Sequence, residues 1–184
     1  MDGVIAVLPN ELALVAEATA EPTAFAVIYD HYFRSIYNYV RYRVVDADIT
    51  DDLTAQVFEK ALVGLDGYHP DRGSFAAWLF TISRNMVNDH LRAEKRRRWL
   101  SLDILRAKAN PASLPEETIV QNETRAELLL AVTHLSDRER DLLALKFVAG
   151  LSNSRIAELT GLSQSNVGVI VYRAVRRLRV ELGN

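Results

Sequence analysis

The sequence predicts an all-α protein of two small helical domains joined by a flexible linker, the C-terminal one a helix-turn-helix. Apolar residues recur every three or four positions along most of the chain, as they do on the buried face of helices. Glycine and proline fall between the periodic segments. One aperiodic stretch, "ANPASLPEE", contains two prolines, which is typical of a linker. We therefore expect domains at 1–99 and 118–184, with the linker at 100–117.

The first domain is expected to contain three main helices after an amphipathic helical segment at 11–20. The first runs over 23–45, and Thr50 is predicted to cap the second, with two aspartates in its first turn, where the helix dipole favours acids. A glycine- and proline-containing loop at 64–74 follows, and Ser74 is predicted to cap the third helix. The inward positions of the first helix are expected to be Phe25, Ile28, Tyr29, Tyr32, Ile36, Tyr39 and Val40. Those of the third are expected to be Phe75, Trp78, Leu79, Ile82 and Met86.

The second domain carries several helix-capping patterns. Ser136 and the glutamate three residues later form a capping box. Gly150 and Gly161 are natural residues for helix ends, and Ser152 and Ser163 are expected to cap the last two helices. The buried stripe of the last helix is expected to comprise Val167, Ile170, Val171, Ala174, Val175 and Leu178.

The composition narrows the classes of function. The chain has 184 residues and no cysteine, which excludes disulfides and thiolate metal sites within it. No apolar run approaches the ~20 residues that a membrane-spanning helix requires. Acidic residues interrupt the N-terminal segment, unlike a signal peptide. We therefore expect a cytoplasmic protein without a membrane segment of its own.

Charge is unevenly distributed along the chain. Residues 1–60 carry four basic and ten acidic side chains, whereas the rest carries eighteen basic and fourteen acidic ones. Such an asymmetry indicates one surface for a basic protein partner and another for a polyanion. Chance segregation over solvated faces is an equally simple explanation.

The last helices are laid out as in a helix-turn-helix, with two short helices joined by a glycine-containing turn and followed by a longer helix rich in arginine. Glutamine and asparagine can read base edges, and arginine can bind phosphate. A helical hairpin with a solvated basic end would explain the same pattern. The face left open for DNA comprises Gln164, Ser165, Asn166, Gly168, Val169, Tyr172, Arg173 and Arg176.

Positive charge also gathers after the third predicted helix. Arg84, Asn88, Arg92 and Lys95 lie three or four residues apart, on one side of a helix, and the run continues through 96–98. Aromatic residues stand nearby in the sequence, and cations interleaved with rings suit single-stranded nucleic acid. A solvated helix end, favoured by the helix dipole, is the alternative for the basic run.

The combination of these segments resembles the sigma-70 family of bacterial RNA polymerase sigma factors, most closely its extracytoplasmic-function (ECF) group. The stretches that carry the resemblance are "DDLTAQVFEKAL" at 51–62, "FAAWLFTISRNMVNDHLR" at 75–92 and the segment from "LSDRERDLLALKFVAGLS" to "VYRAVRRLR" at 135–179. The linker is too short for the extra middle domain of housekeeping sigma factors. The chain differs from many relatives in having Gly168 and Ile170 where they carry lysine and arginine.

The resemblance implies which residues contact the polymerase and the promoter. The first domain would bind the clamp of the polymerase β′ subunit and melt the −10 element, with the loop 66–74 receiving a flipped-out base. The second would read the −35 element. The expected polymerase-binding residues are Asp52, Leu53, Gln56, Val57 and Lys60. The expected −10 residues are Tyr68, Arg72, Arg84, Asn85, Asn88, Arg92, Lys95, Arg96, Arg97 and Arg98. The expected −35 residues are Ser163, Gln164, Ser165, Asn166, Gly168, Val169, Tyr172, Arg173 and Arg176.

The expected function is that of an alternative sigma factor, which is not an enzyme and needs no metal or cofactor. Its expected partners are core RNA polymerase, through the β and β′ subunits, promoter DNA, and an anti-sigma factor that covers the exposed DNA-binding faces of the free chain. A sigma-like mimic that sequesters an anti-sigma factor is one alternative, and a helix-turn-helix repressor is another. A mimic would not need the basic runs at 92–98 and 173–179, which favours the sigma factor.

Overall fold

The computed structural model describes residues 8–44, 46–101, 128 and 131–183. Every regular element within these residues is helical, which confirms the predicted all-α fold. None of these helices is both long enough and apolar enough to cross a membrane. The predicted linker lies outside the described residues from 102 onward, and so does the first part of the helical segment expected from 118.

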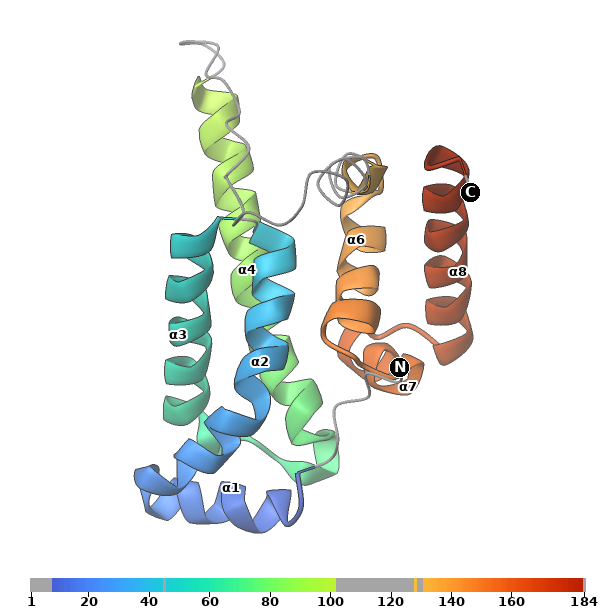
Figure 1. Cartoon of the computed structure of the whole chain (residues 1–184). Coiled ribbons are helices and arrows are strands. Elements are labelled where there is room, and N and C mark those ends of the chain that lie inside the picture. The colour runs from blue at the N-terminus through green and yellow to red at the C-terminus, as the bar shows by residue number, and fades with distance from the viewer. Residues whose placement is uncertain (1–7, 45, 102–127, 129–130, 184) are drawn as a thin grey trace, which may run out of the picture.

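Four helices form the N-terminal half of the described chain: α1 (Glu11–Ala20), α2 (Phe25–Val44), α3 (Ala47–Val63) and α4 (Phe75–Ser101). Figure 1 shows α2, α3 and α4 side by side, with α1 crossing below them. Three short 3₁₀ turns complete this half, namely η1 (Pro22–Ala24), η2 (Leu65–Gly67) and η3 (Pro70–Arg72). The loop predicted before the third main helix therefore contains two helical turns, and the amide N–H of Ala77 donates to the Ser74 hydroxyl as expected of a cap.

The buried face of α2 differs from the predicted one at Tyr29. Ile28, Tyr32 and Ile36, which are spaced four residues apart, are buried in the core. Tyr29 is 38% exposed, so the expectation that it points inward is wrong. It belongs to a neighbouring stripe one position further round the helix, and its ring packs on that of Phe58 with centroids 4.6 Å apart.

The start of α3 also differs from the prediction. Asp46 is the N-cap, and its carboxylate accepts a hydrogen bond from the amide of Ile49 at 3.0 Å. Thr50 lies one turn inside the helix, is fully buried, and donates its hydroxyl to the carbonyl of Asp46. Thr50 is therefore not the cap, because the side chain of Asp46, four residues earlier, already accepts a hydrogen bond from a backbone amide in the first turn of the helix.

The C-terminal half includes α6 (Asp137–Leu143), the π-helical turn η4 (Ala144–Val148), α7 (Asn153–Thr160) and α8 (Gln164–Glu181), and the described residues 131–133 before α6 are also helical. The predicted caps are confirmed: Ser136 forms a complete capping box, and Ser152 and Ser163 accept from backbone amides in the first turns of α7 and α8. Gly161 ends α7 with a φ of 70°, a left-handed conformation that glycine adopts without steric cost.

The two halves pack directly on each other. The buried apolar residues of both form one continuous core, and α2 contacts η4 while α4 contacts α7. Large core side chains come from both sides of the junction, including Tyr39 and Leu79 from the N-terminal half and Leu142 and Ile156 from the C-terminal half. This packing places one side of α4 against the C-terminal half.

Candidate polymerase and nucleic-acid interfaces

The cationic side of α4 faces a cleft between the two halves of the chain. Because an α-helix has 3.6 residues per turn, Arg84, Asn88 and Lys95 share one side of α4. This side lines a cleft of about 360 Å³. The remaining charged side chains of the cleft are Arg43, Arg92, Arg138, Asp137 and Asp141. The cleft is therefore cationic, but two carboxylates from α6 stand inside it.

Asp141 of α6 joins the two halves through both of its carboxylate oxygens. It is 4% exposed. Nε of Arg84 lies 2.6 Å from Oδ2, and the hydroxyl of Tyr39 donates to Oδ1 at 2.7 Å. Burial, together with the charge of Asp141, raises the pKa of Tyr39 well above its ordinary value. The phenol therefore stays protonated and can donate, and the buried carboxylate is fully partnered.

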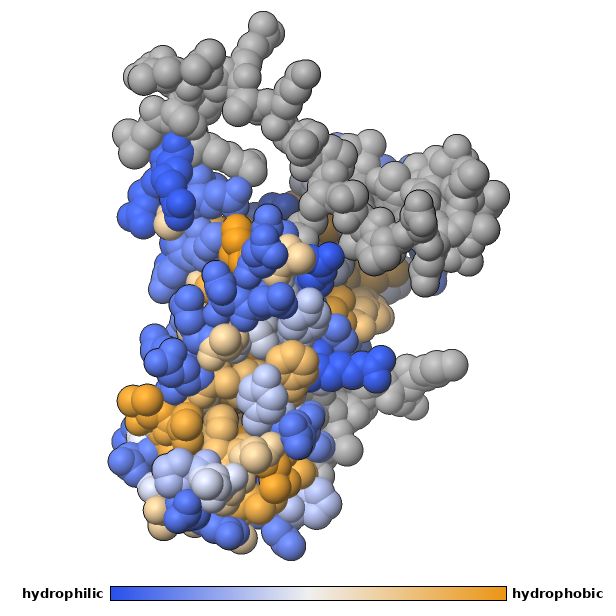
Figure 2. All heavy atoms as spheres, turned by 60° about the vertical axis from the view of Figure 1, so that its left-hand side comes forward, coloured by the Kyte–Doolittle hydropathy of each residue, from blue (hydrophilic) through white to orange (hydrophobic). Residues whose placement is uncertain are grey.

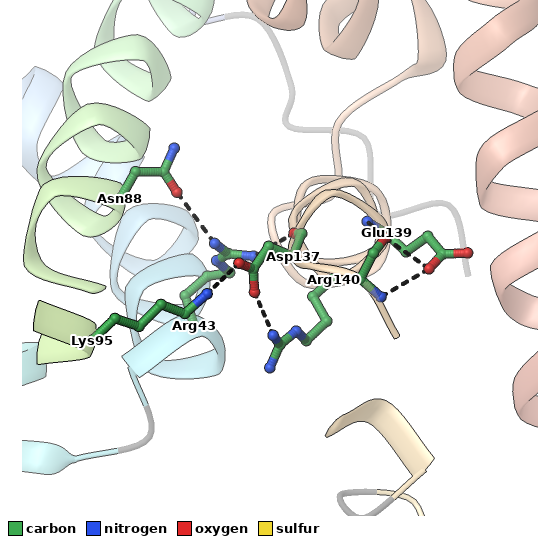
Figure 3. Close-up of polar contacts among 7 residues, drawn as sticks. Arg43, Asn88, Lys95, Asp137, Glu139 and Arg140 are labelled. Carbon is green, nitrogen blue, oxygen red and sulfur yellow. Dashed lines mark hydrogen bonds and ion pairs between the residues drawn. The ribbon is translucent and has the colours of Figure 1, made fainter. Parts of the chain in front are cut away.

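A second carboxylate of α6, Asp137, binds the end of the same cationic side (Figure 3). It forms ion pairs with Lys95 and Arg140, and the hydrogen bond from Lys95 lowers its pKa. Arg43 donates to the backbone carbonyl of Asp137 at 3.1 Å and to Oδ1 of Asn88 at 3.2 Å. Arg84 and Asn88 are therefore partly covered by contacts within the chain, whereas Lys95 stays exposed.

The loop expected to receive a flipped base lies at the N-terminal end of α4. The ring of Tyr68 is buried and packs on Phe75 and Trp78 with centroid distances of 5.3 Å and 5.7 Å. Its hydroxyl donates to the carbonyl of Gly73 at 3.2 Å. Tyr68 therefore shapes the loop and presents no free face for stacking. A cavity of about 230 Å³ lies beside it, with Trp78 and the loop on one side and Glu158 of α7 on the other.

Glu158 also contacts the first turn of α4. Its Oε1 accepts a hydrogen bond from the amide of Ser74 at 2.9 Å. The same oxygen would lie 2.4 Å from a Cβ added at Gly73, whose φ is 147°. Glycine is thus favoured at this position for its backbone conformation, and a larger residue would also displace the carboxylate of Glu158.

The other members of the predicted −10 set lie mostly on the surface. Arg92 forms an exposed ion pair with Asp89 at 3.2 Å, which adds little stability and leaves the guanidinium accessible. The exposed members are Arg72, Asn85, Arg92, Lys95, Arg96 and Arg97. The side chain of Arg98 lies outside the described part of the chain, although its backbone belongs to α4.

Helix α8 has the division of faces that the sequence predicts. Val167, Val171 and Ala174 are buried, whereas the predicted −35 side chains other than Gly168 are exposed. Gly168 is half-buried toward α7, where an added Cβ would lie 3.4 Å from Nδ2 of Asn153. The role of this face in DNA recognition stays a prediction.

The predicted polymerase-binding residues of α3 separate into surface and core positions. Asp52, Gln56 and Lys60 are exposed. Leu53 is 8% exposed and Val57 fully buried, so their side chains pack α3 onto the core and are not available for direct contact with a partner.

An exposed apolar patch, which the sequence analysis missed, adjoins this surface. Its large side chains on α2 are Val27, Tyr29 and Phe33, and the rings of Tyr29 and Phe33 lie 5.2 Å apart. Figure 2 shows apolar side chains gathered on the lower part of this face. The recurrence of aromatics at 29, 33 and 37, beside the buried stripe, is the sequence pattern that indicates the patch.

Within the described residues, no group of three or more His, Cys, Asp or Glu side chains is placed to hold a metal ion. The surfaces described above offer hydrogen bonding, ion pairing and apolar burial. These are the interactions through which proteins bind nucleic acids and other proteins.

Comparison with known families identifies two matching segments. The model of sigma-70 region 2 matches residues 28–97, and that of sigma-70 region 4 matches residues 125–178. The ECF RNA polymerase sigma factor BldN of Streptomyces coelicolor is 32% identical over 168 residues, which cover 91% of this chain and 64% of that protein. The ECF RNA polymerase sigma factor SigX of Bacillus subtilis is 28% identical over 165 residues, covering 84% of this chain and 81% of that protein.

Two solved structures share the fold. CnrH, determined in complex with the cytosolic domain of CnrY, has a TM-score of 0.69 at 23% identity and covers 93% of this chain and 96% of its own. The sigma factor RpoE of Bartonella quintana, in complex with the anti-sigma factor NepR, has a TM-score of 0.67 at 21% identity, covering 86% of this chain and 96% of its own.

Proposed function

The chain belongs to the sigma-70 family of RNA polymerase sigma factors, within its ECF group, and we propose that it is an alternative sigma factor that directs core RNA polymerase to specific promoters. The observation that carries this proposal is the match of both region 2 and region 4 to the two parts of one chain. Each part carries a surface suited to its task, the cationic α4 in one and the exposed face of α8 in the other.

The polymerase would bind the face formed by α2 and α3. Asp52, Gln56 and Lys60 supply exposed polar groups there, and Tyr29 and Phe33 supply an adjoining apolar area. Protein interfaces commonly place aromatic anchors at the centre and polar residues at the rim. The buried Leu53 and Val57 would hold α3 in place for this contact.

Promoter DNA would bind at two separate sites. The domain expected at 1–99 would melt and hold the −10 element with α4 and the pocket beside Trp78, and the domain expected at 118–184 would read the −35 element with α8. Exposed Gln164 and Asn166 at the start of α8 are suited to base edges in the major groove. The chain would not itself be an enzyme, because the polymerase performs the chemistry of transcription, and it would act in the cytoplasm together with that polymerase.

An anti-sigma factor is the regulatory partner that we propose. Support comes from the two solved relatives in the fold, each of which was determined with a protein partner, one of them an anti-sigma factor. The candidate surfaces are the exposed faces of α2, α3 and α8 described above.

Reconstitution with core polymerase tests the proposal. The full chain is mixed with purified core polymerase, and the holoenzyme is used to select transcribed fragments from a genomic library of the host. A sigma factor co-purifies with the core and yields start sites that share −10 and −35 elements. A mimic would bind an anti-sigma factor but give no transcripts, and a repressor would bind DNA without the polymerase, so either outcome would refute the proposal.

A further inference from the structure

We propose that two exposed apolar side chains of α8, Val169 and Tyr172, contact the C5-methyl group of a thymine in the major groove and so favour that base in the −35 element. This inference rests on the proposed function, because it concerns the face of α8 that would read the −35 element. It deepens that function by naming the base and the chemical group that the centre of this face would recognise.

The two side chains lie at the centre of the outward face of α8. The inward side of the helix is marked by its three buried residues, Val167, Val171 and Ala174. Because successive residues of an α-helix are turned by about 100° around its axis, the opposite side follows positions 165, 169, 172 and 176. The side chains there are all exposed, and they are Ser165, Val169, Tyr172 and Arg176. An apolar pair therefore occupies the middle of the line that would enter a groove.

Both side chains of the pair lie outside the buried core. Val169 is 41% exposed and Tyr172 is 66% exposed. Valine is a poorer helix former than alanine, so helix propensity does not favour it at position 169 either. Residues three apart on a helix are neighbours, with Cβ atoms about 5–6 Å apart, and the pair therefore forms one apolar area. A partner that covers this area removes it from water, which is favourable.

Thymine is the base that offers a matching group to this apolar area. The base edges in the major groove present hydrogen-bond donors and acceptors, and thymine alone adds a methyl group. The side chain of Val169 can neither donate nor accept a hydrogen bond, so it gains nothing from the polar edges of the other bases. Contact between its methyl groups and that of thymine removes apolar surface of both from water.

The charges around the pair favour DNA over an apolar protein surface as its partner. The helix carries four arginines and one glutamate. Arg173 and Arg176 are exposed beside the pair, where their guanidinium groups can bind the phosphates that border a major groove. An apolar protein partner would instead have to cover these cations without pairing them, which is costly. The same face thus combines cations for the DNA backbone with an apolar area for one base.

Replacement of thymine by deoxyuridine tests the inference, because deoxyuridine lacks only the C5-methyl group. The probe is a promoter duplex recovered by the holoenzyme in the selection described above, with each −35 thymine of either strand replaced in turn. Binding of the holoenzyme should weaken about fourfold at one of these positions, as expected for the loss of one buried methyl group. The ratio of the two affinities should stay constant over a salt series, because the contact is not ionic. Deoxyuridine between the −35 and −10 elements is the control and should have no effect.

A substitution of Val169 identifies the side chain that contacts the methyl group. Val169→Ser should lower the ratio of thymine to deoxyuridine affinity from about fourfold to near one, because the two changes remove the same contact. Val180→Ser is the matched control and should keep the full ratio. Val180 is also an exposed valine of α8, but it lies about 16 Å further along the helix axis. The deoxyuridine measurement itself uses the unchanged chain, so it does not depend on the folding of either variant.

The outcomes separate this inference from the proposed function. A holoenzyme that transcribes specific promoters but binds thymine and deoxyuridine equally at every −35 position would overturn the methyl contact and leave the proposed function intact. A −35 element without thymine, or an equal ratio in Val169→Ser and the unchanged chain, would overturn it as well. If Val169→Ser weakens binding to core polymerase and leaves the ratio unchanged, the pair contacts protein instead. The absence of any promoter-specific complex would refute the proposed function, and this inference with it.

Discussion

The hydroxyl of Tyr39 donates a hydrogen bond to Oδ1 of Asp141 across 102 positions of sequence and across the junction of the two halves. Both residues are buried, and the second oxygen of Asp141 binds Arg84. A buried carboxylate is costly unless its oxygens are partnered. The stability of the folded chain and the closure of its halves therefore depend on the same pair.

Loss of the Tyr39 hydroxyl should destabilise the chain. Tyr39→Phe leaves Oδ1 of Asp141 buried without its partner, so we expect a loss of about 1–3 kcal/mol in the free energy of unfolding. Urea denaturation followed by circular dichroism measures it. Tyr37→Phe, on the same helix but without this hydrogen bond, is the matched control and should change stability by less than about 0.5 kcal/mol. Equal effects of the two substitutions would contradict the assigned hydrogen bond.

Alkaline pH should destabilise the fold through its buried tyrosines. Burial raises the pKa of Tyr39 above the ordinary value of 10.0, and burial also raises that of Tyr68. A pKa raised in the folded state gives stability that is complete below pH 10 and is lost as the pH rises above it, because the unfolded chain then ionises more readily. We expect the melting temperature to fall above pH 10, and less steeply in Tyr39→Phe. An identical decline in both chains would refute this cause.

Polymerase binding should depend on exposed residues of α2 and α3. Asp52→Lys changes an exposed side chain, so the melting temperature should stay nearly constant. Phe33→Ser also removes ring contacts with Tyr29 and Phe58, so some loss of stability is expected and circular dichroism checks that this variant is folded. The affinity for core polymerase should fall by about tenfold or more, as expected for anchor positions of an interface. Glu17→Lys on α1 is the charge-matched control for Asp52→Lys. An unchanged affinity for core polymerase in both the α2 and the α3 variant would show that the polymerase binds another surface of the chain.

The two DNA sites should differ in what they contribute. Arg96→Glu with Arg97→Glu should weaken holoenzyme binding to all promoters alike and flatten its salt dependence, by about 0.9 in log–log slope for each phosphate of duplex DNA that these arginines neutralise. Gln164→Ala or Arg173→Ala should instead reorder preferences among −35 sequences, since each good base contact contributes about 1–3 kcal/mol. Binding over a salt series on a panel of −35 variants distinguishes the two. Uniform scaling by Gln164→Ala would exclude base reading by that residue.

Substitution of Gly168 should stabilise α8. This glycine lies inside a helix, where alanine is favoured by about 1 kcal/mol, and an added Cβ would lie at ordinary contact distance, 3.4 Å, from Asn153. We expect Gly168→Ala to raise the free energy of unfolding by about 0.5–1 kcal/mol. Thermal melts compare the stability of the variants. Gly161→Ala should destabilise the chain instead, because the φ of 70° at this position is strained for alanine. A destabilised Gly168→Ala chain would show that α7 requires glycine there.

Local patterns in the sequence predicted the caps of the C-terminal helices. The capping box at Ser136 and the caps at Ser152 and Ser163 each need only neighbouring residues, so the sequence determines them without tertiary context. The start of α3 was predicted wrongly because Asp46 and Thr50 both have capping side chains. The burial of Thr50 decides between them, and burial depends on the packing of the whole domain.

The site was less predictable than the fold. The spacing of Arg84, Asn88 and Lys95 correctly predicted a shared helix side, but nothing local indicated that Asp137 and Asp141 would cover it. Helix periodicity likewise could not assign Tyr29, which lies at the border of the buried stripe, to the surface. Contacts between distant segments depend on how the two halves of the chain pack together. The periodicity of apolar residues within each helix carries no information about that packing.

The shared use of Arg84 has a consequence for how such a protein evolves. If Arg84 binds both Asp141 and the −10 strand, a substitution that alters one contact alters the other, so this helix can change only together with its acidic partners in α6. The positions of α8 that are predicted to face bases, such as Gln164 and Asn166, are exposed and would have no such second role in the packing of the two halves. Among descendants of one ancestor, −35 preference should therefore diverge faster than −10 preference, and residues 39, 84 and 141 should vary together.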